Sequence, residues 1–76
     1  EKEIADASGG IRRIDRLLVR PESVRVVDFK SGAAHREAHR AQLRGYAALA
    51  AARYPGRAVA GTLVYLDRGE AEEVAL

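Results

Sequence analysis

The sequence predicts a small α/β domain built on one mixed sheet. Residues 11–30 show the alternating apolar pattern of two strands joined by a tight turn, and residues 35–54 have the composition of a long helix. The helix is followed by residues 58–66, a run that is apolar on both faces and typical of an interior, often parallel, strand. A crossover helix then places this strand in the same sheet as the hairpin.

Three strands are expected before the helix. Residues 1–8 are short and polar and form a candidate edge strand, which the turn signal Ser8-Gly9-Gly10 ends. Residues 11–20 carry Ile, Leu and Val in alternation, and residues 24–30 are the next apolar run. Residues 20–23 between them contain a proline, which fixes one backbone dihedral of a turn. The two runs therefore predict a β-hairpin.

One helix and two strands are expected after the hairpin. Residues 35–54 are rich in Ala, Arg, Leu and Gln and lack proline, and Pro55-Gly56 marks their end. Residues 58–66 form the interior strand, residues 67–70 a turn, and residues 71–76 a short last strand. The expected order is three strands, the helix and two further strands.

Composition excludes several classes of protein. The chain has no Cys, so disulfide frameworks, zinc fingers and thiolate-bound iron–sulfur clusters are excluded, and the absence fits a reducing cytoplasm. No apolar run approaches the ~20 residues of a membrane-spanning helix. We therefore expect a cytoplasmic protein without membrane contact. The net charge is only +2, yet arginines cluster in the predicted strand, where they suit phosphate groups or form a solvated surface: Arg12, Arg13, Arg16 and Arg20.

The length and the first residue suggest part of a larger protein. The chain has 76 residues, begins with Glu1 and contains no Met. A domain of this size buries roughly 60% of its unfolded surface and is marginally stable. We expect residues 1–76 to form a single partial domain, a fragment of a larger chain.

Two aspartates stand inside the apolar strands of the hairpin. A carboxylate in such a run is costly unless something compensates it. A turn centred after Pro21 places Asp15 directly opposite Asp28, and directly paired residues have Cβ atoms ~4.5–5.5 Å apart. Two carboxylates this close repel unless a cation lies between them, and Mg²⁺ accepts one or two carboxylates while keeping several waters.

A lysine is expected beside this acidic pair. In the same register Lys30 lies next to the two aspartates and opposite Arg13. Two carboxylates and an ammonium at one spot indicate a divalent metal with a charge partner for a water or a phosphate. The alternative is two solvated aspartates near strand ends, neutralised by Arg16 and Lys30.

The opposite face of the hairpin is also apolar. It carries Ile14, Leu18, Val27 and Phe29. Because the single helix can cover only one face of the sheet, we expect the second face to be covered by a segment outside this chain or by a partner copy.

The helix adds polar candidates. Gln42 and Tyr46 are four residues apart and share one face, where they can bind a phosphate or orient the acidic strand; a surface glutamine and a core tyrosine are the alternative. Gly45 costs the helix roughly 1 kcal/mol against Ala and is expected to allow close packing against the sheet. His35 and His39 have zinc-ligand spacing, but no third ligand accompanies them, so an exposed position near the helix start is expected.

Three motifs in this order resemble a known family. Residues 9–17 read Gly-x-x-x-Arg-Ile-Asp-Arg-Leu, residues 26–32 read Val-Val-Asp-Phe-Lys-Ser-Gly, and residues 42–46 read Gln-Leu-x-x-Tyr. Together they resemble the RecB-like nuclease domain of the PD-(D/E)XK superfamily, which closes many bacterial helicase–nucleases of DNA repair and recombination, including the AddA type. The resemblance implies a restriction-endonuclease-like mixed sheet and extends from about residue 9 to the end of the chain.

The resemblance also implies roles for the acidic hairpin. Asp15 and Asp28 would bind Mg²⁺, for which Mn²⁺ can substitute, and the backbone carbonyl of Phe29 would be a further ligand. Lys30 would position or polarise the attacking water and stabilise developing charge. The implied reaction is metal-assisted hydrolysis of a DNA phosphodiester.

The resemblance extends to the helix and to partners. Gln42 and Tyr46 correspond to the helical motif of this branch and are implied to be catalytic residues. The implied partners are DNA, the remainder of a helicase–nuclease chain and a partner subunit. Family members usually have an N-terminal helix with a further His or Glu near the metal, and this chain begins after that point. The alternative function is a catalytically inactive nuclease-fold module that binds or guides DNA; an unrelated α/β domain with a coincidental acidic hairpin is a third reading.

Overall fold

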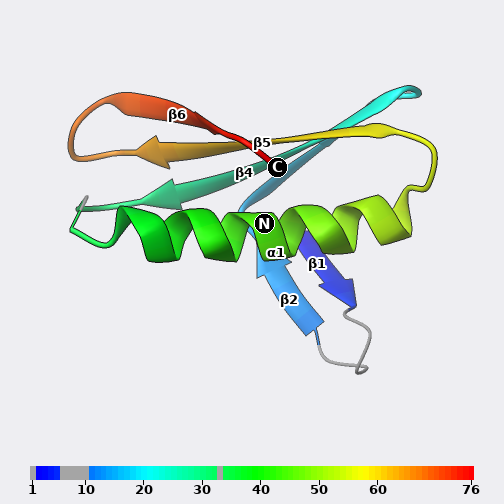
Figure 1. Ribbon diagram of the computed structural model, residues 1–76, viewed down its shortest axis with the longest axis horizontal. Coiled ribbons are helices and arrows are strands. Elements are labelled where there is room, and N and C mark those ends of the chain that lie inside the picture. Colours follow the sequence, from blue (N-terminus) through cyan, green and yellow to red (C-terminus); the bar gives the residue numbers. More distant parts are fainter. Residues whose placement is uncertain (1, 6–10, 33) are drawn as a thin grey trace.

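The main sheet is mixed and carries one helix on one of its faces (Figure 1). The computed structural model describes residues 2–5, 11–32 and 34–76. Its elements, in chain order, are β1 (Lys2–Ala5), β2 (Ile11–Ile14), β3 (Arg16–Val19), β4 (Ser23–Lys30), α1 (Arg36–Arg53), β5 (Ala58–Tyr65) and β6 (Glu70–Val74).

The main sheet has the strand order β3-β4-β5-β6. β4 and β5 run parallel because α1 returns the chain to the same end of the sheet, and the two outer pairs are antiparallel. The α/β class, the crossover helix and the mixed sheet predicted from the sequence are confirmed, and the arrangement is consistent with a restriction-endonuclease-like fold.

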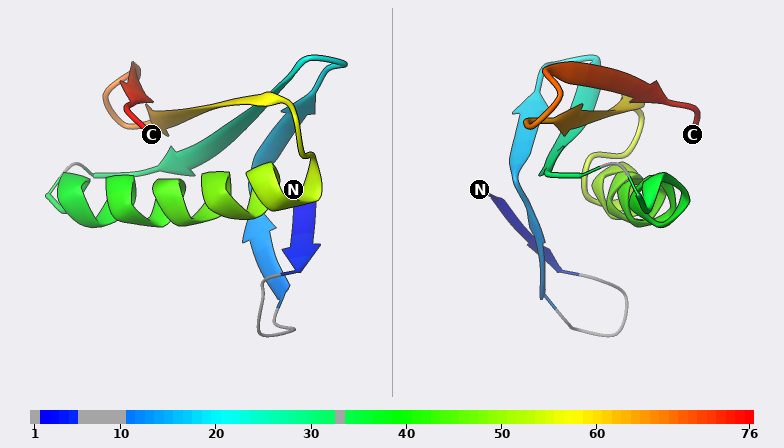
Figure 2. Two further views of the ribbon diagram at one scale, coloured as in Figure 1. Left: turned by 45° about the vertical axis from the view of Figure 1, so that its right-hand side comes forward. Right: turned by 90° about the vertical axis from the view of Figure 1, so that its left-hand side faces the viewer.

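The first hairpin stands apart from the main sheet. β1 and β2 pair only with each other and extend past the far side of α1 (Figures 1 and 2). The sequence predicted one strand over residues 11–20, but the chain bends at Asp15 and forms two strands. The bend has a local cause. The backbone N–H of Phe29 donates to the Asp15 carboxylate. If the β3–β4 ladder continued, this N–H would donate to a backbone carbonyl of the neighbouring strand instead.

Because the chain bends at Asp15, two expectations about strand register are wrong. β3 and β4 pair as predicted, with Leu17 opposite Val26, but the ladder ends at Arg16, so Asp15 does not pair with Asp28 in the sheet as expected. Arg13 pairs with β1, so Lys30 has no partner there and instead pairs with β5 on its other side. Ile14 was expected on the outer face, yet it is completely buried beneath α1, because the bend interrupts the strict alternation of side chains.

The core lies between α1 and the face of the sheet that α1 covers (Figure 2). Its buried side chains are Ile14, Val24, Val26, Leu43, Ala50, Leu63, Tyr65 and Val74. On the opposite face, Leu18 and Phe29 are 37% and 38% exposed, although Val27 between them in the sheet is buried. No described element covers that face, in agreement with the expectation that one helix protects only one side. Within the described segments, no helix has the length and apolar character needed to cross a bilayer.

Two glycines differ sharply in their surroundings. A Cβ at Gly61 would lie 2.9 Å from Cδ2 of Leu43, so β5 and α1 approach closely at this glycine. Gly45 was expected to serve that purpose, but a Cβ there meets no atom within 4 Å. The close helix–sheet contact therefore depends on the glycine of the strand, and Gly45 is an exposed helix residue.

The Gly45→Ala variant is expected to stabilise the protein by about 1 kcal/mol, because alanine has the higher helix propensity and meets open space at this position. Urea unfolding measures the change. The matched control is Ala41→Gly at another exposed position of α1, which should destabilise by a similar amount. A loss of stability in Gly45→Ala would show that this glycine makes a contact that its open surroundings do not reveal.

Candidate active site

The site lies where β4 ends, on the side of the sheet that faces α1. Asp28 continues the inward-facing row of Val24 and Val26 and is only 4% exposed. Its Oδ2 atom is buried and has no hydrogen-bond partner among the described residues. Lys30 lies two residues further along the same row, and its Nζ forms an ion pair with this oxygen at 3.1 Å. One oxygen of this buried carboxylate therefore forms an ion pair but no hydrogen bond.

Asp15 meets Asp28 from the bend between β2 and β3. Its Oδ2 accepts the backbone N–H of Phe29 at 2.9 Å, and its carboxyl group is a neighbour of that of Asp28. Two neighbouring carboxyl groups repel each other when both are ionised, so their pKa values move apart. Burial and the neighbouring Asp15 raise the pKa of Asp28 to about 6. The neighbouring Asp28 and the hydrogen bond from Phe29 lower the pKa of Asp15, so Asp28 is the first of the two to take up a proton as the pH falls.

A chain of polar contacts joins Lys30 to the helix. Lys30 Nζ donates to Gln42 Oε1 at 2.6 Å, and Gln42 Nε2 donates to the hydroxyl of Tyr46 at 3.0 Å. Tyr46 is half-buried and packs against the core, so its hydroxyl has a fixed position. The structure therefore brings the four side chains Asp28, Lys30, Gln42 and Tyr46 into one connected row, with Asp15 attached to its acidic end.

The donor set fits a hard divalent cation. The described residues contain no group of three or more His, Cys, Asp and Glu side chains that could hold a metal ion. Mg²⁺, however, is usually held by one or two carboxylates and keeps several waters. Asp15 and Asp28 supply two, and the uncommitted Oδ2 of Asp28 is a ready ligand atom. In a strand the N–H and carbonyl of one residue point to the same side, so the Phe29 carbonyl lies on the edge that faces Asp15.

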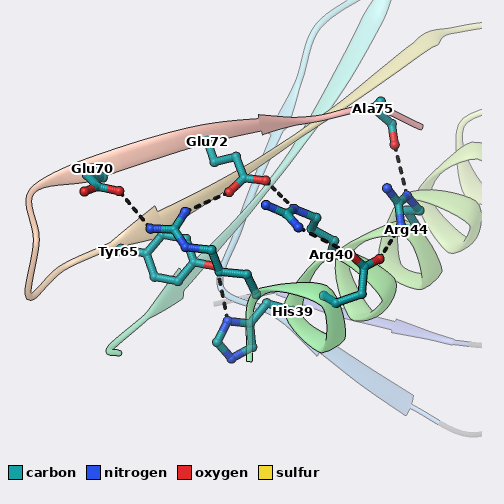
Figure 3. Close-up of polar contacts among 9 residues, drawn as sticks. His39, Arg40, Arg44, Tyr65, Glu70, Glu72 and Ala75 are labelled. Atoms are coloured by element: carbon teal, nitrogen blue, oxygen red, sulfur yellow. Dashed lines mark hydrogen bonds and ion pairs between the residues drawn. The ribbon is translucent and has the colours of Figure 1, made fainter. Parts of the chain in front are cut away.

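The two histidines do not form a metal site with other described residues. His35 is exposed, as expected for the start of the helix. His39 was expected to be exposed as well, but it is half-buried, and its Nδ1 lies 3.2 Å from the hydroxyl of Tyr65 (Figure 3). This contact was missed because it depends on the parallel register of β4 and β5, which places Tyr65 beside Lys30.

Ion pairs fasten β6 to the helix beside the site (Figure 3). Arg36 contacts Glu70 and Glu72, and Arg40 contacts Glu72. These arginines are thus engaged by carboxylates of the same chain, and they lower the pKa of Glu72. The sequence did contain a signal for this network, because the two glutamates share one face of a strand and the two arginines are one helical turn apart.

The mixed sheet, its crossover helix and the acidic hairpin with its lysine define a class of nuclease-like α/β domains. The family model of the PD-(D/E)XK nuclease superfamily matches residues 11–75, nearly the whole chain. The chain therefore belongs to the PD-(D/E)XK nuclease superfamily, whose members are generally hydrolytic nucleases that use divalent metals. No curated protein and no solved structure gave a significant match.

Proposed function

We propose that the protein hydrolyses phosphodiester bonds of DNA with Mg²⁺, which Mn²⁺ can replace, held by Asp15, Asp28 and the carbonyl of Phe29. One observation supports this most strongly. The buried Oδ2 of Asp28 has no hydrogen-bond partner among the described residues, although it lies beside a second carboxyl group and an ammonium. The ion pair with Lys30 offsets part of the cost of burying this atom, and a metal ion bound to it would supply the missing partner. A bound divalent ion would supply Lewis-acid activation of a water and neutralise charge on the phosphate.

Lys30 has a separate role in this proposal. An ammonium has three N–H donors, of which Gln42 accepts one, while Asp28 forms an ion pair with the charge. Another N–H can donate to a phosphate oxygen or to the attacking water, where a fixed positive charge stabilises the negative charge that develops in the transition state. Gln42 holds Lys30 in place, and Tyr46 holds Gln42, so the helix sets the direction of the ammonium.

We further propose that this domain is part of a DNA repair helicase–nuclease of the RecB and AddA type, and that its partners include the rest of such a chain. The support is the order and spacing of the three motifs in residues 9–17, 26–32 and 42–46. Exonuclease action and a cytoplasmic location belong to the same proposal.

DNA cleavage by the protein in Mg²⁺ tests the proposed function. The wild type is expected to cut labelled DNA in Mg²⁺ or Mn²⁺ and to stop when EDTA removes the ion, because two carboxylates of the site hold it. Asp15→Asn should lose the activity, while Glu22→Gln, at an exposed turn at the other end of β4, should keep it. Binding of DNA without any cleavage would favour the alternative function, a catalytically inactive module that guides DNA. Cleavage that EDTA does not affect would contradict the proposed role of a bound metal ion.

Stability gives a second readout that does not need activity. A ligand that binds only the folded state raises the melting temperature, so Mn²⁺ should stabilise the wild type and Glu22→Gln alike. The effect should shrink or vanish in Asp15→Asn. Equal stabilisation of the wild type and Asp15→Asn would place the ion elsewhere.

A further inference from the structure

His39 and Tyr65 form a rigid pair beside the acidic site. Tyr65 is the last residue of β5, is completely buried and pairs with Lys30 in the parallel ladder. Its hydroxyl lies 3.2 Å from Nδ1 of His39, as Figure 3 shows. The guanidinium of Arg36 lies 4.4 Å from the centre of the Tyr65 ring and is itself held by Glu70 and Glu72. The tyrosine therefore has a fixed position.

The contact with Tyr65 fixes the tautomer of the histidine. Partial burial and the nearby ammonium of Lys30 lower the pKa of His39, which favours the neutral ring. A phenolic O–H needs an acceptor when it is buried, and Nδ1 of a neutral imidazole is one. With Nδ1 accepting, the ring proton is on Nε2. His39 thus presents one N–H on the side of its ring away from Tyr65.

The position of His39 places this N–H next to the site. His39 precedes Gln42 by three residues, which puts both on the same side of α1. Gln42 accepts a hydrogen bond from Lys30, and Lys30 pairs with Tyr65, so the histidine, the glutamine and the lysine surround the end of β4. Tyr65 is the partner of Nδ1, and Nε2 has no hydrogen-bond partner among the described residues.

We propose that His39 is a DNA-binding residue, whose Nε2–H donates a hydrogen bond to a backbone phosphate next to the one held at Lys30. The ligand is a phosphodiester oxygen, and the assignment rests on the proposed function, because it takes DNA as the substrate. An oriented, uncharged donor fixes the register of a strand without adding to the electrostatic attraction. Lys30 supplies charge at the reacting phosphate, and His39 positions the neighbouring one.

Two substitutions separate this role from simple support of Tyr65. The amide nitrogen of His39→Gln reaches about as far as Nε2 and keeps a donor there, whereas the amide of His39→Asn replaces only the Nδ1 side and can still serve Tyr65. The Kd for labelled DNA is measured in Ca²⁺, a divalent ion chosen so that binding is followed without turnover. We expect Asn to weaken binding about tenfold, the effect of losing one hydrogen bond to a charged group, and Gln to stay near the wild type.

The salt dependence of binding and a second variant without a donor complete the test. Loss of an uncharged donor leaves the slope of log K against log[salt] unchanged in His39→Asn, while Lys30→Gln should flatten it by about 0.9 on duplex DNA. If the Asn variant fails to fold, His39→Leu fills the same space without a donor and should give the same Kd. The inference is overturned if Asn and Leu bind DNA as the wild type does; cleavage by the wild type in Mg²⁺ would then leave the proposed function standing. A wild type that neither binds nor cuts DNA would overturn both.

Discussion

The Asp28→Asn variant is expected to lose DNA cleavage by at least about a hundredfold, which is the scale of removing one group that stabilises the transition state. The same variant should be more stable than the wild type above pH 6. The pKa of Asp28 is raised from 3.8 to about 6, mainly by burial and then by Asp15, so the folded state holds this proton more tightly than the unfolded chain does. The stabilising contribution is complete below pH 3.8 and is lost as the pH rises through 6. Asparagine has no proton to lose, so no charge is buried at this position as the pH rises.

Urea unfolding in EDTA at pH 5, 6 and 8 measures this effect. The advantage of Asp28→Asn over the wild type should already be about half developed at pH 5 and level off at about 1–3 kcal/mol by pH 8, since one pKa unit corresponds to about 1.4 kcal/mol and the shift begins at 3.8. Glu22→Gln, at an exposed turn, should show no such growth. An Asn variant that is less stable than the wild type at pH 8 would show that the ionised Asp28 is stabilised in the fold, contrary to its burial.

The Gly61→Val variant is expected to destabilise the protein by about 1–3 kcal/mol, because the new side chain would enter space that Leu43 fills. Leu43 is completely buried, so Leu43→Ala alone should cost about 2–5 kcal/mol through the cavity it leaves. In a domain of 76 residues, changes of this size are a large part of the total stability.

The two changes together give a sharper test of the contact. The added methyl groups at position 61 can occupy space that alanine leaves at position 43, so the double variant should be destabilised by less than the sum of the single ones. Gly61→Ala, whose single Cβ would lie 2.9 Å from the leucine, should fall between the wild type and Gly61→Val. Urea unfolding of the four proteins yields the coupling energy. Strict additivity would show that β5 and α1 do not meet at this point.

The elements of the main sheet could be predicted because their signals are local. The helix expected over residues 35–54 is α1 at Arg36–Arg53, and the apolar run at 58–66 is the interior strand β5. The register of β3 and β4 followed from the proline turn alone, since a short turn fixes which residues pair. The bend at Asp15 could not be predicted, because it depends on a side chain that takes the backbone N–H of a residue on another strand.

The candidate site also has a part that could be predicted from the sequence and a part that could not. The acidic pair and Lys30 could be placed together from alternation along two adjacent strands, and the structure brings them into contact. The meeting of Gln42 with Lys30 depends on how α1 lies over the sheet, which the sequence suggested only through the family motif. His39 could not be assigned its partner, because Tyr65 lies in a strand that joins the sheet after the helix.

The parallel pairing of β4 and β5 has a consequence for the order in which the site is assembled. The acidic pair depends on a hairpin of neighbouring residues, whereas the support of Lys30 depends on α1 and β5, which are distant in the sequence. Local contacts form at a lower cost in loop-closure entropy than distant ones. During folding the two carboxylates can therefore meet before the lysine is fixed. A fluctuation that detaches α1 would conversely leave the proposed metal ligands together while releasing the ammonium that completes the site.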